Sequence, residues 1–167
     1  MRVDFVRHGI AEERAPRLLD AERALTNKGR TKAAAIAARL HRWDWQWDVI
    51  LTSPLVRARQ TAEILQAAQL AAEVEVLEAL APGGEFGEFI RWQQSRPDVN
   101  DVALVGHQPD LSCWIELAVW GQANGHIQLK KAGVGRVEFA GGQARLGRGL
   151  LLEVLTPKTL LADIHNF

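Results

Sequence analysis

Three short apolar runs, each followed by a segment with helical periodicity, restrict this chain to an α/β architecture. The runs read VDFV at 3–6, DVILT at 48–52 and DVALVG at 101–106. Runs of this length and character suit strands that are buried on both faces, as in parallel sheets. A helical segment after each strand returns the chain so that the next strand runs in the same direction, which is the βαβ pattern.

Capping residues indicate where the helices begin. Thr26 suits the N-cap of a first long helix, and Ser53-Pro54 suits the N-cap and first helical position of a second. Further helices are expected over 85–94 and from Pro109 to Gly121.

Two antiparallel strands are expected late in the chain, VGRVEFA at 134–140 and GRGLLLEVL at 147–155, around the turn signal Gly141-Gly142. The sequence therefore predicts a three-layer α/β/α sandwich with a mostly parallel central sheet and an antiparallel edge strand. A length of 167 residues without a composition break predicts one domain over 1–167.

The charge balance argues against partners that need a global electric field. Twenty Lys plus Arg match twenty Asp plus Glu, so neither nucleic acid nor an acidic membrane is an expected partner. The single Cys113 cannot form an internal disulfide, and no signal sequence or membrane-spanning run is recognised. We therefore expect a cytoplasmic protein.

Basic and titratable side chains follow each of the three apolar strands. Arg7 and His8 follow the first strand, Arg57 and Arg59 lie just beyond the second, and His107 follows the third. The carboxyl ends of parallel strands share one edge of the sheet, where ligands bind. Because no acidic residue lies directly at these junctions, the cluster predicts an anion site.

Phosphate suits this cluster best. Arg binds phosphate oxygens in pairs, and the N-terminus of the helix near Ser53 would add free N–H groups. Two histidines go beyond anion binding: one neutral imidazole can attack phosphorus to give a phosphohistidine, while the other stabilises charge in the transition state. The charge of Arg7 beside His8 disfavours the imidazolium and keeps the attacking lone pair available.

Each of these residues alone also has a structural interpretation. A single His near a strand end is more often structural, and Arg57 or Arg59 alone suits a solvated helix charge. His41, His126 and His165 do not follow the strands and keep the structural interpretation. No HxH, HExxH or CxxC spacing is present, so neither a metal nor another cofactor is expected.

Four ordered motifs resemble the histidine phosphatase superfamily, which includes the cofactor-dependent phosphoglycerate mutases. The motifs are FVRHG at 5–9, RALTNKG at 23–29, LTSPLVRARQTA at 51–62 and LVGHQP at 104–109. The short length, with Lys131-Ala132-Gly133 and Thr156-Pro157-Lys158 late in the chain, is most similar to the SixA-type phosphohistidine phosphatases. The resemblance spans nearly the whole chain and implies a phosphoglycerate mutase-like fold.

The resemblance also implies roles for individual residues. His8 matches the nucleophile and His107 the second histidine of the pocket. Arg7 and Arg57 match the phosphate-binding arginines, and Arg57 is preferred to Arg59 because the motif places its arginine three residues after the proline.

The segment that holds a proton-donating acid in mutases departs from their pattern. It reads VLEALAPGGEFGEF at 76–89 and offers Glu78, Glu85 and Glu88. Glu85 is interpreted as a helix N-terminal residue, with a place at the edge of the site as the alternative. Arg23 either borders the pocket or is a loop charge. A pocket without an acid favours phosphohistidine over sugar phosphates, because an imidazole leaving group can carry its own proton, whereas an alkoxide needs one.

The leading hypothesis is a metal-independent phosphatase with a covalent phosphohistidine intermediate. Its substrate would be phosphohistidine in a protein, such as a phosphotransfer or phosphocarrier domain. The alternatives are a broad-specificity phosphomonoesterase for small phosphate esters and a non-catalytic phosphate-binding module, which would have no use for a nucleophile at His8. The tryptophans of WDWQW at 43–47 either belong to the core or form a docking surface for a protein substrate.

Overall fold

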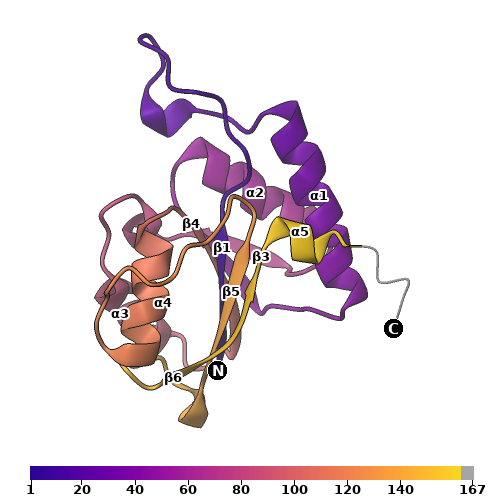
Figure 1. The fold of residues 1–167 in the computed structure, drawn as a ribbon. Coiled ribbons are helices and arrows are strands. Elements are labelled where there is room, and N and C mark those ends of the chain that lie inside the picture. Colours follow the sequence, from indigo (N-terminus) through magenta and orange to yellow (C-terminus); the bar gives the residue numbers. More distant parts are fainter. Residues whose placement is uncertain (163–167) are drawn as a thin grey trace.

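The computed structural model describes residues 1–162, which form a six-stranded sheet with helices on both faces (Figure 1). The strands are β1 (Arg2–Arg7), β2 (Val49–Thr52), β3 (Glu73–Val76), β4 (Asp101–Gly106), β5 (Val134–Phe139) and β6 (Gly149–Leu155). Their order across the sheet is β3-β2-β4-β1-β5-β6. His165 lies outside the described residues.

The strand directions confirm the predicted fold class. β1, β2, β3 and β4 run parallel, while β5 runs antiparallel to both β1 and β6. The antiparallel strand β5 therefore lies one place in from the edge, which β6 forms. The edge strand β3 was not predicted, because its sequence EVEV is half-exposed and lacks the apolar run of a central strand.

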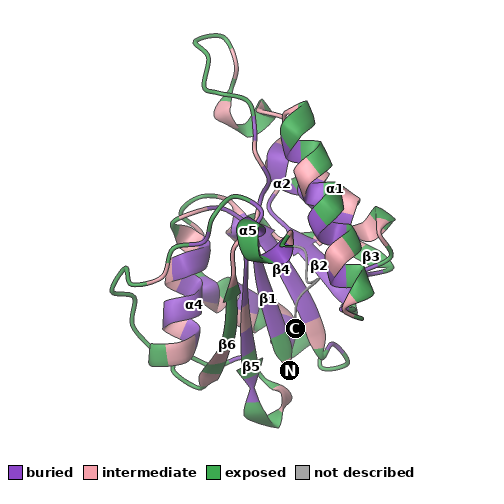
Figure 2. Ribbon diagram, turned by 45° about the vertical axis from the view of Figure 1, so that its right-hand side comes forward, coloured by how far each residue is buried: buried purple, intermediate pink, exposed green. Residues whose placement is uncertain are grey.

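Two apolar cores lie on opposite faces of the sheet because successive strand residues alternate between its faces. Phe5 and Leu104 pack with Phe89 and Trp114 on one face, whereas Val105 packs on the other. Figure 2 shows buried residues along the central strands and exposed ones along β6. The central strands are therefore fixed from both sides, which holds their carboxyl ends in place.

Four of the α-helices lie close to the predicted segments, and the short helix α5 was not predicted. The α-helices are α1 (Asn27–Arg42), α2 (Val56–Ala67), α3 (Phe86–Ser95), α4 (Asp110–Trp120) and α5 (Pro157–Leu160), and the 3-10 turns are η1 (Asp20–Glu22), η2 (Glu78–Leu80) and η3 (Ala140–Gly142). Thr26 caps α1, as predicted, and its Oγ1 accepts the N–H of Gly29 at 3.0 Å. The prediction that Ser53 caps α2 was wrong, since that helix begins only at Val56. None of the helices within residues 1–162 combines the length and the apolar character needed to cross a membrane.

Two of the three tryptophans of the WDWQW segment belong to the core, and Trp43 is partly buried against it. Trp45 and Trp47 are buried, and the indole N–H of Trp47 donates to Asp4 Oδ2 at 2.6 Å. Arg136 forms an ion pair with the same buried carboxylate, and its guanidinium lies over the Trp45 ring, 3.3 Å from the centroid. These contacts explain the acidic residue inside β1, and they leave Trp45 and Trp47 no free surface for docking a partner.

Candidate functional site

The register of the parallel strands brings the predicted site residues to one edge of the sheet. Arg7 lies opposite Gly106 in the pairing of β1 with β4, and Thr52 lies opposite Val105 in the pairing of β2 with β4. The backbone N–H of His8 donates to Gly106 O at 3.0 Å, which extends the ladder by one residue. The three strands therefore end side by side, and the residues that follow them begin at the same edge of the sheet.

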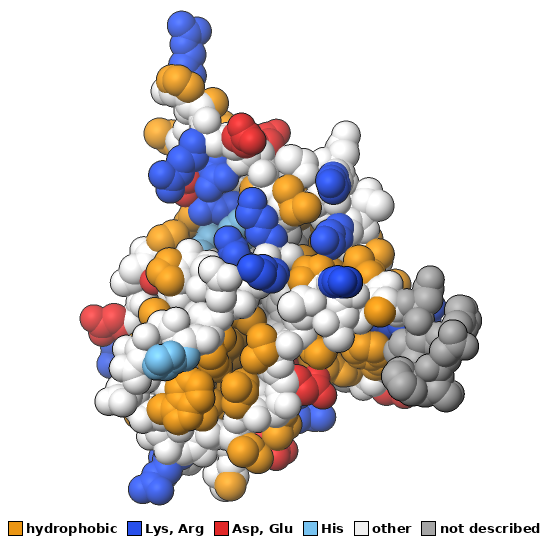
Figure 3. Space-filling view, in the orientation of Figure 1, with side chains coloured by type: hydrophobic (Ala, Val, Ile, Leu, Met, Phe, Trp, Pro, Cys, Tyr) orange, Lys and Arg blue, Asp and Glu red, His pale blue; other side chains and the backbone are white. Residues whose placement is uncertain are grey.

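A pocket of about 300 Å³ lies at this edge. Figure 3 shows histidine atoms among a group of Lys and Arg side chains on this side of the molecule. The charged and titratable residues that line the pocket are His8, His107, Arg7, Arg14, Arg23, Arg57, Lys131 and Asp20. The four residues to which the sequence assigned phosphate chemistry thus lie around one cavity, together with three further cations and one carboxylate.

The ring of His8 is held in one tautomer. Its Nδ1 lies 2.7 Å from the carbonyl oxygen of Gly9, and because a carbonyl only accepts, Nδ1 carries the proton. Nε2 therefore bears the lone pair, and Arg57 Nε donates to it at 3.3 Å. Burial lowers the pKa of His8 to about 3, and the nearby charges add to this effect, with that of Arg7 among the smallest. The side chain is a neutral imidazole with a directed lone pair.

His107 lies beside it, with the two ring centroids 5.1 Å apart. Its Nε2 is 2.8 Å from the hydroxyl oxygen of Ser53, which fixes the ring orientation. Burial, followed by the charge of Arg57, lowers the pKa of His107 to about 4. Its Nδ1 is buried and has no hydrogen-bond partner among the described residues. Ser53 thus positions a site histidine, in addition to accepting the N–H of Leu55 at 3.3 Å.

The two predicted phosphate-binding arginines are both restrained, by different partners. Arg7 Nη1 donates to the carbonyl oxygen of Leu129 at 2.8 Å, while its buried Nε lacks a partner among the described residues. Arg57 is 3% exposed and donates from Nη1 to the carbonyl oxygen of Asp20 at 2.7 Å and from Nη2 to its carboxylate at 3.0 Å. Both guanidinium groups are held by oxygen acceptors before any ligand arrives.

The segment between His8 and α1 folds back on itself, and part of it lines the pocket. Thr26 N donates to Ile10 O at 3.0 Å, and Leu25 N donates to the side chain of Gln60 on α2 at 2.7 Å. The first turn of α1 comes so close that a Cβ on Gly29 would lie 2.0 Å from Ile10 O, which requires glycine there. The RALTNKG motif therefore positions the loop that carries Asp20.

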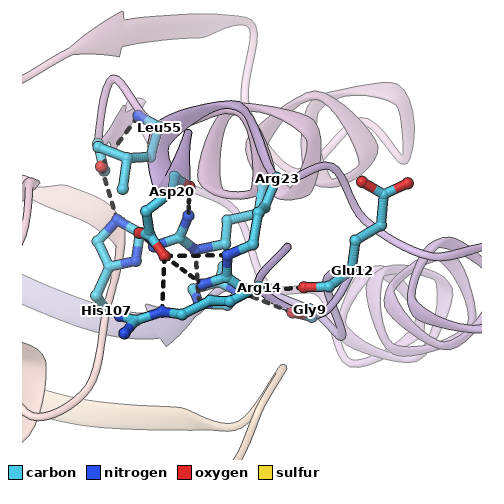
Figure 4. A network of polar contacts seen from close by, with 10 residues as sticks. Gly9, Glu12, Arg14, Asp20, Arg23, Leu55 and His107 are labelled. Atoms are coloured by element: carbon cyan, nitrogen blue, oxygen red, sulfur yellow. Dashed lines mark hydrogen bonds and ion pairs between the residues drawn. The ribbon is translucent and has the colours of Figure 1, made fainter. Parts of the chain in front are cut away.

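Asp20 is the site residue that the sequence did not reveal. Its carboxylate accepts from Arg57, from Arg23 at 2.9 Å and from Arg14 at 3.2 Å, and Figure 4 shows it among these arginines. Burial acts to raise the pKa of Asp20, but the hydrogen bond from Arg23 and the charge of Arg57 outweigh it and keep the pKa below its ordinary value. The expectation of cations without a counter-charge was wrong, because Asp20, farther along the loop that follows β1, supplies one.

Of the remaining predicted residues, the arginine lines the pocket and the three glutamates do not. Arg23 lines the pocket, where it also donates to the carbonyl oxygen of Glu12 at 2.7 Å. Glu85 occupies the N-cap position of α3 without a capping hydrogen bond and lines a different depression. Glu78 and Glu88 do not line the pocket either, and Glu88 pairs with Arg91 on the surface. Within residues 1–162, Asp20 is the only carboxylate that lines it.

The other arginine and the two other histidines considered in the sequence analysis and described by the structure are exposed and lie outside the pocket. Arg59 is exposed on α2 and does not line the pocket, which is consistent with a solvated helix charge. His41 and His126 are also exposed and lie outside it.

Comparison with known proteins gives a consistent result. Residues 3–82, which include Arg7, His8 and Arg57, match the model of the histidine phosphatase superfamily (branch 1). An uncharacterised protein from Picosynechococcus sp. is 46% identical over 149 residues, covering 87% of this chain and 88% of that protein.

Solved structures share the whole fold. The protein histidine phosphatase SixA complexed with tungstate is 25% identical and superposes with a TM-score of 0.82, covering 96% of this chain and 99% of that one. The alpha-ribazole phosphatase from Shigella flexneri has the same fold at 18% identity, with a TM-score of 0.72 over 93% of this chain and 96% of that one. The sheet order, the matching motifs and these similarities lead to one conclusion: the chain belongs to the histidine phosphatase superfamily.

Proposed function

We propose that this protein is a metal-independent phosphatase in which Nε2 of His8 accepts the phosphoryl group of the substrate. The observation that carries the proposal is the hydrogen bond from His8 Nδ1 to the Gly9 carbonyl. It leaves the lone pair on Nε2, the atom nearest to Arg57. A neutral imidazole nucleophile next to a fixed cation is the arrangement that phosphoryl transfer to nitrogen needs.

The reaction then has two steps. In the first, a P–N bond forms at His8 Nε2 while the bond from phosphorus to the leaving group breaks. In the second, water attacks phosphorus, and the P–N bond breaks to return the neutral imidazole and release phosphate. Arg7 and Arg57 would neutralise the equatorial oxygens, and an oxyanion would also provide partners for the buried Arg7 Nε and His107 Nδ1.

We further propose that the leaving group is the imidazole of a phosphohistidine in a protein. Asp20, whose pKa is below its ordinary value, is held by three arginines and is ionised at neutral pH, so it is not a proton donor in this arrangement. A phosphorylated imidazole does not need one, because its own nitrogen takes the proton. Hydrolysis of small phosphate esters is the second candidate, supported by the fold shared with the alpha-ribazole phosphatase.

Turnover of matched substrates tests both the phosphatase mechanism and the proposed substrate. The expected result is hydrolysis of a phosphohistidine peptide with a higher kcat/KM than that of 3-phosphoglycerate. The substitution His8→Ala should lower kcat by at least about 10³-fold, whereas His126→Ala, a matched change of an exposed histidine, should leave it unchanged. Preference for the ester would contradict the substrate assignment, and full activity of His8→Ala would contradict the phosphatase mechanism. Phosphate binding without any turnover would instead support a non-catalytic module.

A further inference from the structure

We infer that a second depression beside the catalytic pocket binds an anionic group of the substrate, a carboxylate or a second phosphate, next to the phosphoryl group. The inference rests on the proposed phosphatase function and names the class of substrate that the site selects. The depression measures about 590 Å³, and the residues that define its character are Arg7, Ile10, Lys32, Lys130, Lys131 and Lys158. It is larger than the pocket of about 300 Å³ that holds the two histidines.

The two cavities are neighbours that share side chains. Arg7 and Lys131 line both of them. The group of Lys and Arg side chains in Figure 3 extends from the histidine atoms across this face of the molecule. A phosphorylated substrate whose phosphoryl group contacts Arg7 therefore extends past Lys131 into the second depression.

The lining is cationic and has no acidic member. The lysines come from three separate parts of the chain: Lys32 from α1, Lys130 and Lys131 from the segment before β5, and Lys158 from α5. In the described part of the chain, none of the four forms an ion pair with a carboxylate. The whole chain has no net charge, so this concentration of positive charge is local. Like charges that converge without a counter-ion attract an anion from solution and guide its approach.

The segment that carries Lys130 and Lys131 is held in place by the catalytic strand and by α4. Leu129 O accepts from Arg7, and the N–H of Ala132 donates to the carbonyl oxygens of Arg7 and His8 at 3.0 and 3.1 Å. The buried carboxylate of Glu116 accepts backbone N–H groups earlier in the same loop. These contacts fix the backbone of both lysines relative to the nucleophile, so less conformational entropy is lost when a ligand binds.

The apolar part of the lining indicates an organic ligand, not a bare ion. Ile10 and Pro157 line the depression between the lysines. Lysine stems also cover apolar surface while their ammonium groups stay in water. A substrate that fits both cavities places its phosphoryl group on His8, its body against these apolar groups and an anionic group among the lysines. A protein with acidic side chains around its phosphohistidine has this chemistry, and so does a small molecule with a second phosphate.

Charge reversal away from the catalytic machinery tests the inference. The double substitution Lys32→Glu with Lys158→Glu changes two residues that line only the second depression. Its matched control is Arg145→Glu with Arg148→Glu, which makes the same change in net charge at a surface where neither cavity lies. Each protein is assayed with p-nitrophenyl phosphate, with a phosphohistidine peptide flanked by Asp and Glu, with the same peptide flanked by Ala and Gln, and with a small bisphosphate.

The lysine variant should lose at least tenfold in kcat/KM on the acidic peptide, on the bisphosphate or on both, and the affected arm identifies the source of the anionic group. Its activity on p-nitrophenyl phosphate and on the neutral peptide should stay within about twofold of the unchanged protein, as should all activities of the control variant. Equal loss on every substrate, or no loss on any, would overturn the inference while leaving the phosphatase function intact. If the unchanged protein hydrolyses none of these phosphates, the proposed function fails, and the anion site is tested by equilibrium binding of the acidic peptide. Loss of binding in the lysine variant alone would support the anion site. Equal binding by the lysine variant and the unchanged protein would overturn it.

Discussion

The Asp20 carboxylate is bound to Arg57, the arginine that also donates to Nε2 of His8, the nucleophile that we propose. Arg57 Nη2 lies 3.0 Å from Asp20 Oδ2, and Arg57 Nε lies 3.3 Å from His8 Nε2. An oxyanion of the protein itself therefore occupies one hydrogen-bonding edge of the guanidinium that would bind phosphate. A phosphoryl group that binds Arg57 at this edge has to replace the Asp20 carboxylate.

Replacing this carboxylate should strengthen phosphate binding. In Asp20→Asn the neutral amide competes less well for Arg57, so inhibition by inorganic phosphate should tighten. The expected gain is about two- to fivefold, because the Asp20 side chain is 40% exposed and such ion pairs contribute at most about 1 kcal/mol. Inhibition constants measured at equal ionic strength check this, with Asp98→Asn as a control on an exposed carboxylate distant in sequence. Weaker phosphate inhibition in Asp20→Asn would contradict the competition.

Both site histidines should stay neutral well below the ordinary range for imidazole. The pKa values of about 3 for His8 and about 4 for His107 both lie below the value of about 6.5 for a free side chain. Nitrogen-15 spectra of the ring atoms recorded from pH 7 to pH 5 should show both rings neutral throughout, with the single ring proton of His8 on Nδ1. A ring that becomes protonated near pH 6.5 would contradict the burial that the structure gives it.

The same pKa shifts predict how stability depends on pH. Because both folded-state pKa values lie below the unfolded value, the unfolded chain takes up protons first as the pH falls. The stabilisation is complete above pH 6.5 and is lost as the pH falls toward about 4 for His107 and about 3 for His8. The free energy of unfolding should therefore fall by about 1.2 kcal/mol between pH 6 and pH 5 for each of the two histidines. Urea denaturation at pH 6 and pH 5 measures this change, which should be smaller by that amount in His107→Gln. An unchanged pH dependence of the free energy of unfolding would contradict the lowered pKa of His107.

Removing the hydroxyl that orients His107 should impair catalysis more than substrate binding. In Ser53→Ala the ring loses its contact at 2.8 Å, so the group that we propose stabilises the transition state is no longer held in place. We expect kcat to fall roughly tenfold to a hundredfold, with KM changed less. Ser95→Ala, at an exposed serine that ends α3, is the control. Equal kcat values for the two variants would show that Ser53 does not position His107 for catalysis.

The loop that supports Arg7 should depend on Glu116. This buried carboxylate accepts the backbone N–H groups of Asn124, Gly125 and Ile127, and the glutamine side chain of Glu116→Gln replaces one accepting oxygen with a donor. The free energy of unfolding should fall by about 2 kcal/mol, which is typical of hydrogen bonds to a buried charged group. Chemical denaturation at neutral pH measures this, and Glu63→Gln, at an exposed position of α2, should have little effect. A loss of stability equal to that of Glu63→Gln would contradict the role of Glu116.

The parts of this molecule that could be predicted from sequence are those that depend on local pattern. The apolar runs of β1, β2 and β4 identify central strands, and because parallel strands end at one edge, the meeting of His8 and His107 follows from their positions after two of these strands. The half-exposed strand β3 has no such run and was missed. The position of Asp20 depends on how a loop without secondary-structure pattern packs against α2, which spacing along the chain does not reveal. The role of Ser53 was misassigned for a related reason, since a serine before Pro54 suits a helix cap and its contact with His107 arises only in the folded sheet.

The most direct measurement is the identification of the phosphorylated atom. The protein is mixed with an excess of a labelled phosphohistidine peptide or phosphoramidate, quenched in alkali within milliseconds and digested for mass spectrometry and phosphorus-31 spectroscopy. We expect an acid-labile label on His8, bound through Nε2, that disappears in His8→Ala and persists longer in Ser53→Ala. Turnover without any label on His8, or label and turnover that both survive in His8→Ala, would contradict it.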